Sequence, residues 1–517
     1  MSSLVEPRTR SSRTIALLST LALVAVMFPA SAEASGSGGY LTSSDPLIVL
    51  DASVANGRVI PIINSGDPLG SFVFEGLPDG IGLTRGHDRK TVDVYVGHEQ
   101  STVPFNFAAD HQDSSISRLT LSTSSWNLGA VKNAEVVLGP EEGFIRFCSA
   151  FMATRDDGFR HPTFFTGEES NDVLPVPAGA GYGPDPSLNP NRQAGYVVAY
   201  DTRTGESTHI PGMGRINHEN TVAVNGNWRG VAMLTTDDTF LPPSSQLYLY
   251  RARSGNAVLA DEGTLYAFRV TATQAGPVNP TDAFNGANDY LDIQPGMTWE
   301  GEFIEVPEEI AKGTTGEAPQ TALENWSNAN NVFQFIRLED IATDEKHPTV
   351  VYVADTGSTR VVPDDATGRM VRGPSGTVGQ ADFGRIFRFV FDSRNPLRVK
   401  AFSVLAQGDN PAAGAFVPFR SPDNLDTSRK SLMVQEDTGN ARIWQFRLGS
   451  GEWRVVAEVT DPVGESSGIV DASAFFGSGW WVLDVQAHGS NQMENSVNGV
   501  LIKRENGQLL LVKIPGS

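Results

Sequence analysis

The chain has little basic charge and a single cysteine, and each shortage excludes a class of function. Lys and Arg number 39 against 60 Asp and Glu in 517 residues, giving a formal net charge of −21. Nucleic acid is therefore not an expected partner, because binding it needs a basic surface. Cys148 stands alone, which excludes an intramolecular disulfide and a cysteine-based zinc cluster. Nucleotide-binding loops and the H-E-x-x-H zinc motif are also missing.

Long apolar runs are scarce too, and the one near the N-terminus has the form of an export signal. Residues 8–13 read R-T-R-S-S-R, residues 15–28 are mostly apolar, and P-A-S-A-E-A follows. Such a run is short for a membrane helix, which needs about 20 residues. We predict a signal peptide over 1–34 and a secreted, periplasmic or extracellular mature protein, with no stable membrane span. An uncleaved membrane anchor is the alternative.

Turn-forming residues are plentiful, and short strand-like runs recur six times. Gly and Pro number 52 and 31, which argues against a helical bundle. Each run is β-branched or aromatic, and each is followed by an acidic position. The runs with their acidic ends are 92–96 with His98-Glu99, 163–166 with Glu168-Glu169, 231–235 with Asp237-Asp238, 350–353 with Asp355, 432–435 with Glu436-Asp437, and 480–483 with Asp484.

A second polar landmark precedes each run by a similar distance. The six landmarks are centred on Asp79, Cys148, Glu219, Glu339-Asp340, Asp423 and Asp471. Six copies of one all-strand unit predict an all-β fold, a six-bladed β-propeller with long insertions. We expect one propeller domain over 40–517, with insertions near 171–195, 275–332 and 362–382 and a short helix near 317–329.

The repeat also predicts where the acids gather. The start of one strand and the end of its antiparallel neighbour lie at the same edge of a sheet. Six such pairs around an axis bring their acids to one channel mouth, where they repel one another unless cations bind. Calcium, which prefers six to eight oxygen ligands, is the expected cofactor. Ordinary solvated turn acids are the alternative for any single pair.

Three further residues are candidates for chemistry at this mouth. His218, beside Glu219, is a candidate proton carrier, or else a hydrogen-bonded structural histidine. Cys148 is either a small buried side chain or a thiolate ligand that would suit iron. Arg337 lies two residues before Glu339, where its planar donor fork suits phosphate oxygens; a salt bridge to a carboxylate is the alternative.

The motifs together resemble the PhoX-like phosphatase superfamily of exported propeller proteins. The matching pieces, in order, are G-L-P-D-G-I-G at 76–82, V-G-H-E at 96–99, R-F-C-S at 146–149, T-G-E-E at 166–169, M-G-R-I-N-H-E at 213–219, F-I-R-L-E-D-I at 335–341, S-P-D-N at 421–424 and V-Q-E-D at 434–437. The resemblance implies a six-bladed propeller that hydrolyses phosphate monoesters with calcium and iron. It implies metal ligation by Glu168, Glu169, Glu219, Glu339, Glu436 and Asp437, and phosphate contact by Arg337.

The chain departs from the family pattern at one metal position. The PhoX-type phosphatases carry a cysteine directly before the paired glutamates, as an iron ligand, and here that residue is Gly167. Their usual twin-arginine signal is also absent. Both departures argue against iron, unless Cys148 supplies the thiolate.

The expected function is a calcium-dependent phosphoric ester hydrolase acting on a small phosphate ester. Its candidate metal ligands are Glu99, Glu168, Glu169, Glu219, Glu339, Asp340, Asp423, Glu436 and Asp437. The alternatives are a non-catalytic calcium-binding propeller and a propeller hydrolase of another class, such as a lactonase. The sequence gives no prediction of oligomeric state.

Overall fold

The structure, a computed structural model, describes residues 38–101, 113–239, 244–488, 493–497 and 500–517. The predicted signal peptide, 1–34, lies outside the described residues. Strands dominate the described part, which includes only four short α-helices. They are α1 (Gly255–Leu259), α2 (Glu308–Ala311), α3 (Pro319–Ala329) and α4 (Ser473–Phe476). No helix among the described residues is long and apolar enough to cross a membrane.

Most strands belong to antiparallel blades of four, counted from the centre outwards. The first three blades are β5 (Pro78–Arg85), β6 (Thr91–His98), β7 (Ser115–Ser122) and β8 (Val131–Leu138); β9 (Phe147–Ala153), β10 (Thr163–Glu168), β13 (Val197–Asp201) and β14 (Ser207–His209); and β15 (His218–Ala223), β16 (Val231–Asp237), β17 (Leu247–Ala252) and β18 (Thr264–Thr273).

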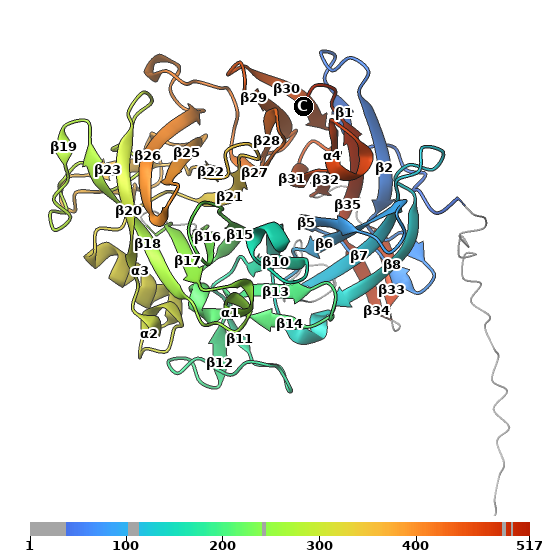
Figure 1. Cartoon of the computed structure of the whole chain (residues 1–517), viewed down its shortest axis with the longest axis horizontal. Coiled ribbons are helices and arrows are strands. Elements are labelled where there is room, and N and C mark those ends of the chain that lie inside the picture. The colour runs from blue at the N-terminus through green and yellow to red at the C-terminus, as the bar shows by residue number, and fades with distance from the viewer. Residues whose placement is uncertain (1–37, 102–112, 240–243, 489–492, 498–499) are drawn as a thin grey trace, which may run out of the picture.

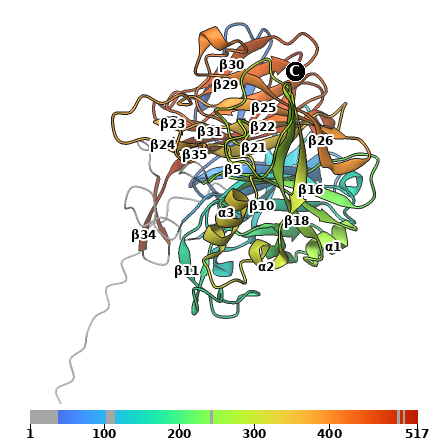
Figure 2. The same cartoon turned by 90° about the vertical axis from the view of Figure 1, so that its left-hand side faces the viewer.

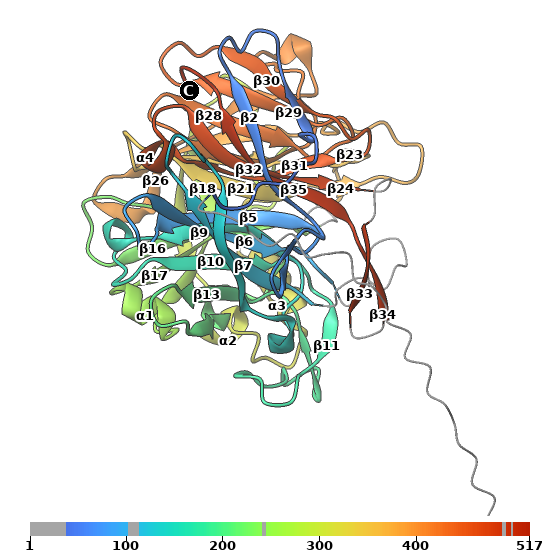
Figure 3. The same ribbon diagram turned by 90° about the vertical axis from the view of Figure 1, so that its right-hand side faces the viewer.

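The other three blades draw on both ends of the chain. They are β21 (Leu338–Thr343), β22 (Val350–Asp355), β25 (Arg385–Asp392) and β26 (Asn395–Gln407); β27 (Pro422–Thr427), β28 (Ser431–Glu436), β29 (Arg442–Arg447) and β30 (Trp453–Val459), with β1 (Ile48–Leu50) added outside; and β31 (Glu465–Asp471), β32 (Trp480–Ala487), β35 (Asn506–Lys513) and β2 (Arg58–Asn64). The N-terminal strand β2 thus completes the C-terminal blade, as Figure 3 shows from the side.

The blades are arranged in a ring around a central axis. The inner strands β5, β9, β15, β21, β27 and β31 contact one another in that cyclic order, with β31 returning to β5. Figure 1 looks down this axis. The expected all-β propeller is therefore confirmed, and the inner strands belong to five sheets of the described residues, of which the ten-stranded one contains both β15 and β21.

Apolar side chains fill the spaces between neighbouring blades. Strands such as β16 and β32 are buried along their whole length, because each is covered on both faces. The largest cluster lies between the third and fourth blades, where Phe268, Phe389 and Phe402 pack edge to face or stacked, with ring centroids 4.7–5.3 Å apart. Such contacts fix each blade against the next and so fix the inner strand ends.

The predicted insertions lie outside the ring. The segment 171–195 carries β11 (Val173–Pro175) and β12 (Asn191–Gln193), and 362–382 overlaps the hairpin β23 (Val361–Asp364) and β24 (Arg369–Arg372). The segment 275–332 carries α2 and α3 at the periphery (Figure 2), and its strand β20 (Trp299–Glu305) joins the third and fourth blades into one sheet. The remaining short strands are β3 (Pro68–Leu69), β4 (Phe72–Val73), β19 (Gly276–Pro277), β33 (Met493–Val497) and β34 (Val500–Arg504).

Candidate metal centre

A β-bulge recurs at the start of each inner strand. In β27, Pro422 pairs with Glu436, but Leu425 pairs with Val434, so one extra residue is inserted. The same shift occurs at the starts of β5, β9, β15 and β21 and within β31. Such a bulge re-aims side chains. The residue two positions before regular pairing resumes is, blade by blade, Asp79, Cys148, Glu219, Glu339, Asp423 and Ser467.

The paired acids that end the second strands divide into two roles. The first member accepts hydrogen bonds from backbone amides in the loop that leads into the inner strand. Glu168 accepts from the Ile145 amide at 3.0 Å, Asp355 from the Ile336 amide at 2.9 Å, and Glu436 from the Arg420 amide at 3.0 Å. Each donor lies three residues before the channel residue of its own blade. Where another acid follows, as Glu169 follows Glu168 and Asp437 follows Glu436, that second acid is the one found among the clustered channel residues.

This division corrects two predicted metal ligands. Both oxygens of Glu168 are held by the buried guanidinium of Arg192, at 2.7 and 2.8 Å, in addition to two backbone amides. Glu436 accepts from two backbone amides and from the Trp444 indole. Glu168 thus accepts four hydrogen bonds and Glu436 three, and neither belongs to the groups of side chains close enough to hold a metal among the described residues, which argues against their predicted role as ligands.

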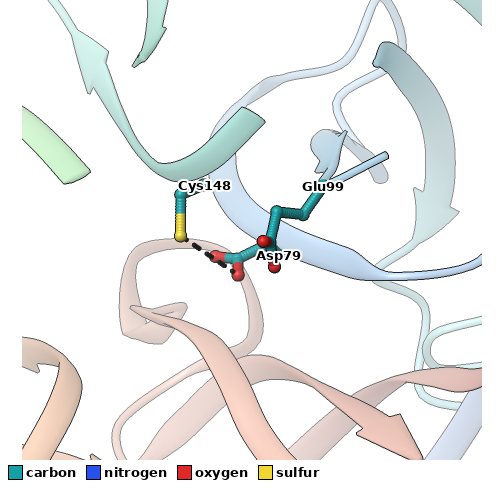
Figure 4. Close-up of side chains that lie close together, drawn as sticks. All are labelled: Asp79, Glu99 and Cys148. Carbon is teal, nitrogen blue, oxygen red and sulfur yellow. Dashed lines mark hydrogen bonds between the residues drawn. The ribbon is translucent and has the colours of Figure 1, made fainter. Parts of the chain in front are cut away.

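The channel-facing residues form one continuous group, which we call the metal-ligand arc. It consists of four overlapping triads whose ligand atoms lie within 4.8 Å of one another: Asp79, Glu99 and Cys148; Cys148, Glu169 and Glu219; Glu219, Glu339 and Asp423; and Asp423, Asp437 and Glu465. Figure 4 shows the first triad, in which the Cys148 thiol donates to Asp79 across 3.6 Å. Because neighbouring triads share a residue, the arc offers sites for several adjacent ions.

The arc is an unfavourable place for uncompensated charge. Burial, and then the neighbouring Glu99, raises the pKa of Asp79 to about 7. Burial also raises the pKa of Glu219 well above its usual range, with repulsion from Asp79 adding to it. Asp79 Oδ1 and Glu219 Oε2 are buried and accept no hydrogen bond within the described part of the chain. Orphaned buried carboxylate oxygens of this kind fit hard divalent cations.

Arg337 lies beside the arc but is already paired. Its Nε and Nη2 donate to both oxygens of Asp238, at 2.9 and 2.6 Å, and Nη2 lies 3.4 Å from Glu339 Oε1. Its side chain is 23% exposed, so the guanidinium still reaches the mouth. The predicted salt bridge is present, and the predicted phosphate contact remains compatible with it.

Two other predicted site residues are held away from the arc. His218 Nε2 donates to the Gly214 carbonyl and Nδ1 accepts from the Thr235 hydroxyl, while burial lowers the pKa of His218 to about 4. Both ring nitrogens of His218 are thus used in hydrogen bonds within the fold, which favours the structural alternative over the predicted proton carrier. Asp340 accepts from the Asn220 side chain and the Leu425 amide, so it ties three inner strands together.

Gly167 is required by packing. A Cβ built at this position would overlap Cβ of His218 on the next inner strand, so a cysteine does not fit there. Cys148, by contrast, is part of two triads. The chain therefore offers its one thiol to the same channel mouth from a different strand.

Sequence reasoning missed or misplaced part of the arc. Asp79 follows a proline at the start of its strand, as Asp423 does, and this shared position could have identified it. Glu465 is the arc residue of β31, whereas the repeat in the sequence predicts Asp471 as the sixth landmark. Asp471 lies at the opposite end of β31, whose mouth end begins with Glu465. The correct choice depends on where the bulge falls, which the sequence does not show.

Comparison with known proteins agrees with this fold and identifies the family. The profile of the family described as alkaline phosphatase PhoX matches residues 141–462, more than half of the chain. No curated protein sequence matches. Among solved structures, Pseudomonas fluorescens PhoX in complex with vanadate, a transition state analogue, has a TM-score of 0.61 at 15% identity, over 90% of this chain and 96% of that one. Sqt1 of Saccharomyces cerevisiae reaches only 0.26 at 9% identity, over 84% of this chain and 96% of that one. The chain belongs to the alkaline phosphatase PhoX family.

Proposed function

We propose that the chain is an exported, calcium-dependent phosphoric ester hydrolase that acts at the channel mouth. The single observation that carries the proposal is the metal-ligand arc, in which nine carboxylate and thiol side chains form four triads around one channel end. Family membership supports a phosphatase, and the predicted signal peptide supports export. The structural relative from Pseudomonas fluorescens binds vanadate, a transition state analogue, which supports phosphoryl-transfer chemistry in a protein of this fold.

In this proposal, the arc carboxylates bind metal ions and Arg337 stabilises charge on the phosphoryl group. The arc carboxylates act as metal ligands, because each already faces other carboxylates and none is placed as an isolated base. Bound cations would supply Lewis acidity towards the phosphoryl oxygens. Arg337, fixed by Asp238 and only partly exposed, directs its guanidinium to the mouth, where negative charge develops on the transferred group.

The ligand types in the arc also indicate which metals it would bind. Eight of the nine arc side chains are carboxylates, which suit calcium. Cys148 contributes a soft sulfur ligand shared by two triads, which suits a transition metal such as iron. We therefore expect calcium throughout the arc, with any softer metal bound at Cys148.

The test is elemental analysis of the purified mature protein combined with turnover of 4-nitrophenyl phosphate before and after chelation. We expect bound calcium and chelator-sensitive turnover. Cys148→Ser should lose any transition metal but keep calcium bound to the Glu339-Asp423 side of the arc. A fully active, calcium-free protein would contradict the proposal. Mass analysis of exported protein, expected to begin near Ser35, tests the localisation.

One observation supports the alternative hypothesis, a calcium-binding propeller without catalytic activity. Arg337 is satisfied by Asp238 without any substrate. Under that hypothesis, Arg337→Ala should not change calcium binding, and the wild-type protein should bind calcium without hydrolysing any phosphate monoester.

A further inference from the structure

A cavity of about 440 Å³ opens between the fourth and fifth blades, outside the arc. We call it the outer pocket; its walls include Phe383, Phe416, Phe419, Arg420, Thr438 and Asn440. These residues belong to loops that precede β25, separate β26 from β27, and separate β28 from β29. All of these loops lie at the edge where the inner strands begin, so the outer pocket is at the same rim as the metal-ligand arc.

Backbone hydrogen bonds join the pocket wall directly to the arc. The Ser421 amide donates to the Phe383 carbonyl at 3.2 Å, and the Asp437 amide donates to the Ser421 carbonyl at 2.8 Å. Glu436, which lines the pocket, is followed immediately by the arc residue Asp437. A molecule held by metals at Asp423 and Asp437 would therefore have the outer pocket beside it.

The wall chemistry is unusual for a surface loop. Phe383 and Phe416 are 36% and 39% exposed, and both line the outer pocket, so two aromatic side chains present apolar surface to one cavity. The Arg420 guanidinium lies 5.2 Å from the centre of the Phe383 ring, a cation–π arrangement. The Phe416 loop is fixed, because its backbone bridges to Gln407 and the Val417 amide donates to the Gln407 carbonyl. Aromatic faces with one stacked guanidinium favour a planar, apolar ligand.

We propose that the outer pocket receives the aryl leaving group of a phosphate monoester whose phosphate lies at the metal-ligand arc. The inference rests on the proposed phosphatase function and adds a substrate preference to it. A volume of about 440 Å³ is enough for a ring system of one or two rings. An aliphatic polyol such as glycerol would gain little from these walls, so aryl esters should be preferred.

The experiment compares kcat/KM for 4-nitrophenyl phosphate and glycerol 2-phosphate with the full metal-loaded protein. Intrinsic reactivity differs between the two esters, so the informative quantity is how a variant changes their ratio. Phe416→Ala should lower the aryl value by roughly tenfold, the scale of one lost aromatic contact, and change the glycerol value less than about twofold. Phe284→Ala is the matched control, since Phe284 is 60% exposed and lies in the 275–332 insertion.

A binding measurement separates failure of this inference from failure of the proposed function. Calorimetry should show that phenylphosphonate binds the wild-type protein more tightly than methylphosphonate does, and that Phe416→Ala removes the difference. Equal effects of Phe416→Ala on both esters, or equal binding of both phosphonates, would overturn the outer-pocket assignment. Turnover of neither ester with the phosphonate difference intact would overturn the proposed phosphatase and support the pocket.

Discussion

Glu168 and Glu169 are adjacent, yet the structure predicts opposite consequences when each is changed to glutamine. Glu168 forms a buried bidentate pair with Arg192, and both side chains are fully inaccessible to solvent. Removing one partner of such a pair costs about 3–5 kcal/mol, because the other charge stays buried. An amide nitrogen in Glu168→Gln would also face the backbone amide of Ile145 or Tyr196, adding about 1 kcal/mol or more.

Glu169→Gln should have the opposite effects: the metal-free protein should keep its stability, and the stabilisation by calcium should fall. Burial, and then repulsion from Asp238 and Glu219, raises the pKa of Glu169 well above its usual range. Neutralising it relieves that repulsion, so the metal-free protein should be at least as stable as the wild type. The calcium response should shrink instead. For the wild type, calcium at about 100 times its dissociation constant adds about 2.7 kcal/mol of stability.

Thermal unfolding with excess calcium and with EDTA measures both effects. Glu168→Gln should lower the midpoint by roughly 5–10 °C in both conditions while keeping the calcium-induced rise. Glu169→Gln should match or exceed the wild type in EDTA and lose most of that rise. The division of paired acids into loop-closing and channel-facing members would be refuted if Glu168→Gln kept its stability but lost the calcium response.

Three further predictions follow from single residues. Arg337→Ala should lower kcat/KM for 4-nitrophenyl phosphate by roughly 10²-fold, the scale of one lost electrostatic donor; unchanged turnover would remove Arg337 from the chemistry. Gly167→Ala should destabilise the fold by about 1–3 kcal/mol in urea unfolding through its overlap with His218, whereas Gly183→Ala, with open space around it, should not. Burial, then Asp292, raises the pKa of Asp289 from 3.8 to about 6, so the folded state keeps a proton that the unfolded chain loses. The stability that the protonated Asp289 contributes is therefore lost as the pH rises from 3.8 to about 6. Over this range the free energy of unfolding of the wild type, relative to that of Asp289→Asn, should fall by about 3 kcal/mol.

The repeat was visible in the sequence because it rests on local chemistry. Alternating β-branched strands, turn residues and acids at strand ends predict a six-fold, all-strand architecture and an acidic mouth. The predicted helix near 317–329 is present as α3. These features depend on residues close together in the chain.

The roles of individual acids were not visible, because they depend on partners far away in the sequence. Glu168 is neutralised by Arg192, which lies in an insertion, and nothing local distinguishes it from Glu169. The bulge decides whether Asp79 and Glu465 turn into the channel, and a shift of one residue reverses a side chain's direction. Arg337 pairs with Asp238 of a different blade, and this contact too lies far from Arg337 in the sequence.

The closure of the ring by β2 has a consequence for how the chain matures. β2 pairs along its length with β35, which ends at Lys513. β1 pairs with β30, which ends at Val459. A chain growing from its N-terminus therefore carries β1 unpaired until β30 is made, and β2 unpaired until β35 is made. The arc draws ligands from Asp79 to Glu465 and so spans nearly the same interval. The last arc ligand, Glu465, is thus made before β35, and a chain truncated before β35 would keep all nine ligands while lacking the strand that pairs with β2.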